Sequence, residues 1–211
     1  MIAPALLLAL AATPWSAQTE AQRATSLEKL RALPLEARLV EISAGFLGTP
    51  YQLSPLGEGA GKDPDPLMRF DKADCLSMVE QTVAMALAPS AEQVLPWLNT
   101  VRYADQVSYA SRNHLMEAQC LPNNVKKGFL VDVTRTLAKD ATRRVVKAVD
   151  ARAWGGKEGQ GLGLAEAEQT RGEFPLDLVP AARAEEVLAR APSGTVFAVL
   201  RKDRPDHVTR V

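Results

Sequence analysis

The spacing of apolar residues predicts helices in the first half of the chain. Leu35, Leu39, Ile42 and Phe46 recur at the intervals that place side chains on one face of a helix. The segment that follows, residues 52–73, is rich in Pro, Gly and Asp and is predicted to be an exposed loop.

A more apolar helix is predicted to begin at Cys75. Asp74 belongs to the residue types that cap helix N-termini, so Cys75 becomes the first helical residue. Pro89 stops this helix. Because the helix carries few polar side chains, we expect it to be largely buried. Its main apolar stripe consists of Leu76, Val79, Val83 and Leu87.

The second half of the chain alternates between strand and helix patterns. Residues 128–138 ("GFLVDVTRTLA") and 195–200 are predicted to be strands, and the latter is apolar on both faces, as in a central strand. Residues 181–192 predict a short helix, and residues 157–175 a flexible excursion. The predicted fold class is therefore α+β. No further strand follows residue 200 to pair with the central one, so we expect the sheet to be cut short at the C-terminus.

The first 22 residues have the pattern of a secretory signal peptide. An apolar run from Ile2 to Ala12 is too short to span a bilayer and is followed by Pro14 and small residues. A buried N-terminal helix is the alternative. We expect export, into a periplasm or cell envelope, and a single domain over residues 23–211 without a stable membrane anchor.

Charge and composition exclude some classes of function. Lys and Arg together number 25, as do Asp and Glu, so no overall charge favours nucleic acid. The locally basic region 126–152 is predicted to be a solvated helix face. The two Cys and two His residues lack the spacing of a zinc site, and no metal or other cofactor is expected.

Cys75 raises the question of chemistry. A helix N-terminus favours the nucleophilic thiolate, but Cys75 can equally be a small core residue or form a disulfide with Cys120. A thiol nucleophile also needs a histidine base, and the chain contains only His114 and His207. Glu80 lies five residues beyond Cys75, so it points away from the thiol and is interpreted as structural or network-forming.

Three segments resemble one family of enzymes: "FLGTPY" from Phe46, "DCLSMVEQTVAMALA" from Asp74 and "VRYADQVSYASRNHLMEAQCLPNN" from Val101. They are similar to the N-acetylmuramoyl-L-alanine amidase-like family, within the NlpC/P60 superfamily of papain-like cell-wall cysteine hydrolases. "PSGTVFAVLRKDRPD" from Pro192 resembles the strand before that superfamily's histidine motif.

The resemblance implies an amide hydrolase that acts on a peptidoglycan stem peptide or muropeptide. It implies a catalytic Cys75 on a helix packed against an antiparallel sheet, with a histidine on a neighbouring strand. Tyr51 and Asp74 match positions near the free amine of the substrate in related enzymes, and we expect His114 to line the cleft without acting as the base.

The histidine motif departs from the family pattern. In "HVTRV", from His207, polar Thr209 and Arg210 stand where a glycine and an apolar residue are expected. Either His207 is the base or the base is absent from this chain. If no histidine reaches Cys75, the chain would be a non-catalytic wall-binding module. If Cys75 and Cys120 are bonded, it would be a disulfide-stapled secreted protein.

Overall fold

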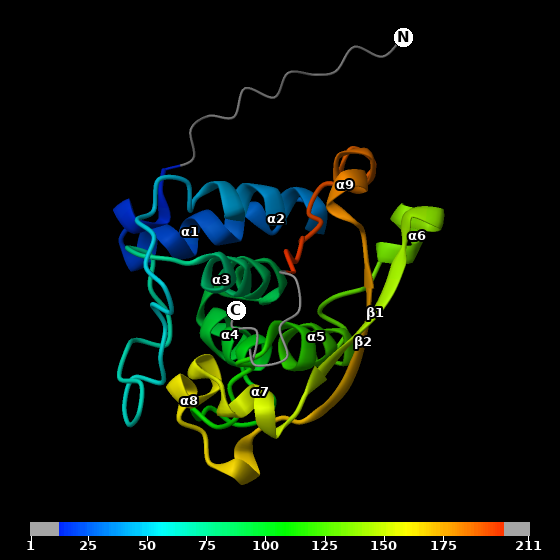
Figure 1. Ribbon diagram of the computed structural model, residues 1–211. Coiled ribbons are helices and arrows are strands. Elements are labelled where there is room, and N and C mark those ends of the chain that lie inside the picture. Colours follow the sequence, from blue (N-terminus) through cyan, green and yellow to red (C-terminus); the bar gives the residue numbers. More distant parts are fainter. Residues whose placement is uncertain (1–12, 201–211) are drawn as a thin grey trace.

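Helices dominate the N-terminal half of the computed structural model, which describes residues 13–200 (Figure 1). Their bounds are α1 Glu20–Leu30, α2 Leu35–Ala44, α3 Cys75–Leu87 and α4 Val94–Arg102. Helix α3 lies between α2 and α4 and packs against both. The apolar spacing thus predicted α2 correctly, and the predicted start of α3 at Cys75 is confirmed.

The main hydrophobic core forms where α1 and α2 meet α3. Ile42 and Ala86 are fully buried there, and Met85 is nearly so. Every residue of α3 from Glu80 to Ala86 is buried, as expected for so apolar a helix. Of the predicted apolar stripe, Val83 is buried, whereas Leu76, Val79 and Leu87 are half-buried. The helix that carries Cys75 is therefore fixed on several sides by packed neighbours.

Trp15 belongs to the same core. Its side chain is 3% exposed, and its indole Nε1 donates a hydrogen bond to the carbonyl oxygen of Ile42 at 2.8 Å. Helix α1 begins at Glu20, capped by Thr19. The expected signal-peptide boundary at residue 22 therefore falls inside α1. The signal peptide itself stays a prediction, because its apolar run lies in residues 1–12, outside the described part of the chain.

The second half contains shorter elements around a two-stranded antiparallel sheet. Strands β1 Arg143–Val149 and β2 Gly172–Leu178 pair along their whole length, from Arg143 opposite Leu178 to Val149 opposite Gly172. The helices are α5 Leu121–Lys126, α6 Thr134–Ala138, α7 Ala151–Gly155, α8 Lys157–Leu162 and α9 Ala181–Leu188. A π-helical turn, Met116–Cys120, leads into α5. The α+β class is confirmed, as is the helix predicted near residue 181.

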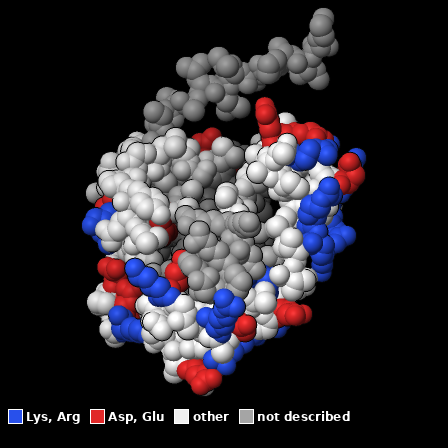
Figure 2. Space-filling model, viewed as in Figure 1, with Lys and Arg blue, Asp and Glu red and all other residues white. Residues whose placement is uncertain are grey.

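The strand predictions were wrong. Residues 128–133 form no strand, and residues 134–138 form α6. Residues 195–200 lie outside any strand, with Phe197 53% and Val199 89% exposed, and within residues 13–200 the sheet consists of β1 and β2. The basic region contains β1 rather than a helix face, and Lys and Arg gather along that side of the molecule (Figure 2). The predicted excursion over residues 157–175 contains α8 and part of β2.

The sheet also lies elsewhere than expected. It contacts α6, α7 and the Met116–Cys120 turn, whereas the principal neighbours of α3 are α2 and α4. Figure 1 shows β1 and β2 at the side of the molecule, beyond α5. Across residues 13–200, no helix has the length and apolar character needed to cross a membrane.

Candidate active site

The first turn of α3 is capped at its N-terminus by Asp74. The Oδ1 atom of Asp74 accepts a hydrogen bond from the backbone N–H of Ser77 at 2.8 Å, and Ser77 Oγ accepts one from the Asp74 N–H at 2.9 Å. This reciprocal capping box satisfies N–H groups that a helix start would otherwise leave unpaired. It fixes Cys75 as the first helical residue, at the end of the helix that favours negative charge.

Cys75 is exposed, and it is a free thiol. Cys120 is also free but buried, and burial raises the pKa of its thiol to about 12. The two cysteines are not bonded to each other, so the structure contradicts the alternative of a Cys75–Cys120 disulfide. Of the two thiols, only that of Cys75 is accessible to a substrate.

The loop before α3 brings Tyr51 to the same place. Tyr51 forms a parallel β-bridge with Ala73, and the Ser54 N–H donates a hydrogen bond to Asp74 Oδ2 at 2.8 Å. The Tyr51 side chain is 71% exposed. Three of the residues singled out in the sequence, Tyr51, Asp74 and Cys75, therefore lie on adjoining backbone segments. Tyr51 and Cys75 themselves are not part of the cavity wall described next.

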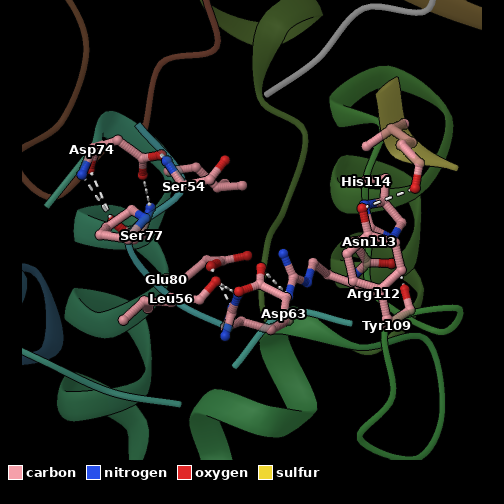
Figure 3. Close-up of a pocket in the computed structure, with 14 residues that line it drawn as sticks. Ser54, Leu56, Asp63, Asp74, Ser77, Glu80, Tyr109, Arg112, Asn113 and His114 are labelled. Atoms are coloured by element: carbon pink, nitrogen blue, oxygen red, sulfur yellow. Dashed lines mark hydrogen bonds and ion pairs between the residues drawn. The ribbon is translucent and has the colours of Figure 1, made fainter. Parts of the chain in front are cut away.

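A polar cavity of about 130 Å³ opens beside the start of α3. Asp74, Ser77 and Glu80, spaced three residues apart along one face of α3, form one wall (Figure 3). The opposite wall comes from the segment that precedes α5 (Figure 3). The ionisable side chains in the lining are Asp63, Asp74, Glu80, Arg102, Tyr109, Arg112 and His114.

Glu80 and Arg102 form a buried ion pair in the lining. Arg102 Nε lies 3.1 Å from Glu80 Oε2, and both side chains are about 95% buried, at 5% and 6% exposure. Burial raises the pKa of Glu80 to about 7, because the cost of desolvating the carboxylate exceeds the attraction of Arg102. The interpretation of Glu80 as a network residue agrees with this pair, but its place in a cavity wall beside Cys75 was missed.

Arg112 lies in the cavity wall opposite α3 and binds the loop that precedes α3. Its Nε and Nη2 donate to Glu58 at 2.7–2.9 Å, and Nη2 also donates to Asp63 at 2.9 Å. Lys62, from the same loop, donates to the carbonyl oxygen of Leu162 at 2.7 Å. These contacts join residues about 50 or 100 positions apart, so no local pattern could have predicted them.

His114 lies across the cavity from Asp74 (Figure 3). Its Nε2 is 2.6 Å from the carbonyl oxygen of Tyr109, and its ring packs against the Tyr109 ring at a centroid distance of 4.7 Å. The structure thus places His114 in the cavity lining, while its place in a substrate cleft and its contact with a substrate stay predictions. His207 lies outside the described residues.

Comparison with solved structures relates the fold to bacterial proteins. A protein of Legionella pneumophila str. Philadelphia 1, family model DUF1460, shares 24% identity and a TM-score of 0.70, over 82% of this chain and 69% of that one. An N-acetylmuramoyl-L-alanine amidase from Bacteroides uniformis ATCC 8492 shares 23% identity and a TM-score of 0.50, over 76% of this chain. The match spans 62% of that amidase's length. At these identities the likeness is one of fold.

Family membership follows from the sequence itself. No curated protein matches the chain significantly. The model of one family, described as N-acetylmuramoyl-L-alanine amidase-like, matches residues 41–209, which include both the loop before α3 and α3 itself. Since the match covers well over half of the chain, the protein belongs to the N-acetylmuramoyl-L-alanine amidase-like family.

Proposed function

We propose that this protein is a cell-wall hydrolase that cleaves an amide bond of peptidoglycan with Cys75 as the nucleophile. The observation that carries the proposal is an exposed thiol at the first position of α3, beside a polar cavity, in a chain whose residues 41–209 match an amidase-like family. We also propose that its core is of the papain-like NlpC/P60 kind, as the resemblance of the "DC" segment suggests.

In the proposed reaction the Cys75 thiolate adds to the amide carbonyl carbon, and the carbonyl oxygen becomes an oxyanion. The free N–H groups at the start of α3 favour that negative charge. The C–N bond then breaks, the amine leaves with a proton, and a thioester remains on Cys75. Water attacks the thioester carbonyl, which releases the acid and restores the thiol.

A histidine must take the thiol proton and return it to the leaving amine. We propose His207 for this role, because it follows residues 192–206, which resemble the strand before the superfamily's histidine motif, although Thr209 and Arg210 depart from that motif. His114 places its imidazole in the cavity lining, where Nε2 contacts the Tyr109 carbonyl oxygen. We therefore propose that His114 contacts substrate rather than acting as the base.

Asp74 and Tyr51 are proposed to bind the substrate next to the scissile bond. Each carboxylate oxygen of Asp74 already accepts one backbone N–H, but a carboxylate oxygen can accept a second donor. The exposed phenol of Tyr51 lies on the bridged segment beside it. A stem peptide or muropeptide presents such donors, and we propose that the protein meets it in the cell envelope after export.

The test compares two cysteine variants on purified peptidoglycan, with released products identified by mass spectrometry. Cys75→Ser is nearly isosteric and should abolish product release. Cys120→Ser, at the buried thiol, is the matched control and should retain it. Hydrolysis by Cys75→Ser at the wild-type rate would end the proposal. Binding to peptidoglycan without hydrolysis by the wild-type protein would favour a non-catalytic wall-binding module.

A further inference from the structure

Arg102 joins three parts of the candidate site through one guanidinium group. It lies at the end of α4 and is 4% exposed. Its Nε faces Glu80 of α3 at 3.1 Å, while Nη2 donates to the carbonyl oxygen of Leu56 at 3.2 Å and Nη1 to that of Gly57 at 3.3 Å. The planar fork of the side chain thus connects α4, α3 and the loop before α3.

The two carbonyl groups belong to a part of the loop that packs tightly against the rest of the same loop. Gly57 has no room for a side chain, because a Cβ there would lie 2.5 Å from the carbonyl oxygen of Asp63. Its N–H donates to the Pro66 carbonyl oxygen at 3.1 Å, which folds the loop back on itself. Leu56 and Ser54 line the cavity, and Ser54 is bonded to Asp74 beside Cys75. A shift of this segment would therefore change the cavity wall and the surroundings of the nucleophile.

We propose that Arg102 is a positioning residue of the candidate active site: by holding the Leu56 and Gly57 carbonyls against Glu80 of α3, it fixes the loop that forms one cavity wall beside Cys75. The inference rests on the proposed function, because it makes the wall a part of the substrate site. It assigns Arg102 no contact with the reacting atoms.

Electrostatics favour positioning over stabilisation as the role of this residue. A buried ion pair contributes little net stability, because the cost of desolvating both charges offsets their attraction. Here burial outweighs the attraction of Arg102 at Glu80, as the raised pKa of that carboxyl shows. In proteins, an apolar pair of the same volume often stabilises a fold as much as a buried ion pair does, but an apolar side chain could not bind the two carbonyl oxygens.

The experiment replaces Arg102 by lysine, with Arg38→Lys as the matched control. Lysine keeps the positive charge for Glu80 but has no fork for the carbonyls. Arg38 also donates to carbonyl oxygens, those of Ala86 at 2.7 Å and Arg31 at 2.8 Å, but it joins α2 to the far end of α3 and is absent from the cavity wall. Both variants lose hydrogen bonds from a guanidinium group to carbonyl oxygens, but only Arg102→Lys loses bonds to the loop before α3.

Three readouts separate positioning from general destabilisation. In Arg102→Lys, amide exchange at Ser54 and Gly57 should accelerate about tenfold or more, because the loop opens locally. The KM for a soluble muropeptide should rise by about tenfold, with a smaller change in kcat, since the wall that orients substrate is loosened. The rate at which iodoacetamide alkylates Cys75 should stay within about twofold, since the capping box is intact. Arg38→Lys should change neither the exchange at these amides nor the KM.

Unchanged amide exchange, or unchanged KM despite faster exchange, would refute the positioning role, as would equal effects in Arg38→Lys. Should Arg102→Lys not fold, Arg102→Gln, which keeps one amide group toward the Leu56 and Gly57 carbonyl oxygens, must then accelerate exchange at Gly57. Amide exchange needs no turnover. A failure of the proposed hydrolase function, seen with Cys75→Ser, is therefore distinguishable from a failure of this inference.

Discussion

Replacing Asp74 should destabilise the protein even when the replacement is asparagine. Both carboxylate oxygens accept a hydrogen bond from a backbone N–H, Oδ1 from Ser77 and Oδ2 from Ser54, each at 2.8 Å. Asparagine has one acceptor oxygen, so it can serve only one of these donors, and its own NH₂ group would face the other. Asparagine is itself a good capping residue, but at position 74 it must lose one of the two bonds.

The magnitudes follow from the two bonds and from the 6% exposure of Asp74. Ser54 is exposed and its hydrogen bond to Asp74 is only part-buried, so losing that bond in Asp74→Asn should cost about 0.5–1.5 kcal/mol. Asp74→Ala loses the cap, about 0.5–2 kcal/mol, the Ser54 bond, about 0.5–1.5 kcal/mol, and the favourable charge at the helix start, about 0.3–1 kcal/mol. At about 2–4 °C per kcal/mol for a chain of this length, Asp74→Asn should lower Tm by several degrees and Asp74→Ala by more.

The assay is thermal unfolding of both variants beside Asp71→Asn. Asp71 lies in the same loop, pairs with Arg69 at 2.7 Å and has a side chain that is 59% exposed. Its replacement should therefore change stability by no more than about 0.5 kcal/mol. Asp74→Asn that melts with the wild type, or Asp71→Asn that loses as much as Asp74→Asn, would refute the assignment of two backbone hydrogen bonds to Asp74.

Two further predictions concern Glu80 in the cavity wall and Gly45 beside Trp15. The pKa of Glu80 is raised from its ordinary value of 4.5 to about 7, so the folded state holds a proton that the unfolded state releases between these values. Its contribution to stability is therefore present below about pH 4.5 and lost as pH rises to about 7. Glu80→Gln should remove this fall in unfolding free energy between pH 4.5 and 7. The same pH dependence in Glu80→Gln and the wild type would contradict the prediction. Gly45→Ala places a Cβ 2.3 Å from Trp15 Nε1 and should cost about 1–3 kcal/mol by overpacking. Gly155→Ala, where a Cβ meets nothing within 4 Å, is its control, and equal Tm values for the two variants would count against the packing of Trp15 in the core.

The N-terminal helices were predictable because local signals agreed there. The apolar spacing of α2 and the Asp74 cap of α3 each depend on residues within one or two turns, and the structure has both. The strands were not predictable, because their local composition points elsewhere. Strand β1 carries Arg143, Arg144 and Lys147, which resemble a charged helix face, and β2 contains Pro175 opposite Val146.

The proposed site residues that could be named from the sequence are those in short family-like motifs. Tyr51, Asp74 and Cys75 were identified from short motifs, and the structure places them on adjoining segments. Glu80 and Arg102 meet only after α3 packs on α4, and a pairing across 22 positions leaves no periodic trace. Tertiary structure alone reveals that they pair and that both line the cavity.

The nucleophilic role of Cys75 is tested most directly by trapping its thioester. The protein is mixed with a soluble muropeptide, quenched in acid within the first turnover and digested, and the peptides are weighed by mass spectrometry. The account predicts an acyl group on the peptide that contains Cys75, in the wild type and in Cys120→Ser, and none on the peptide that contains Cys120. Turnover without any acyl group on Cys75, together with undiminished turnover by Cys75→Ser, would contradict it.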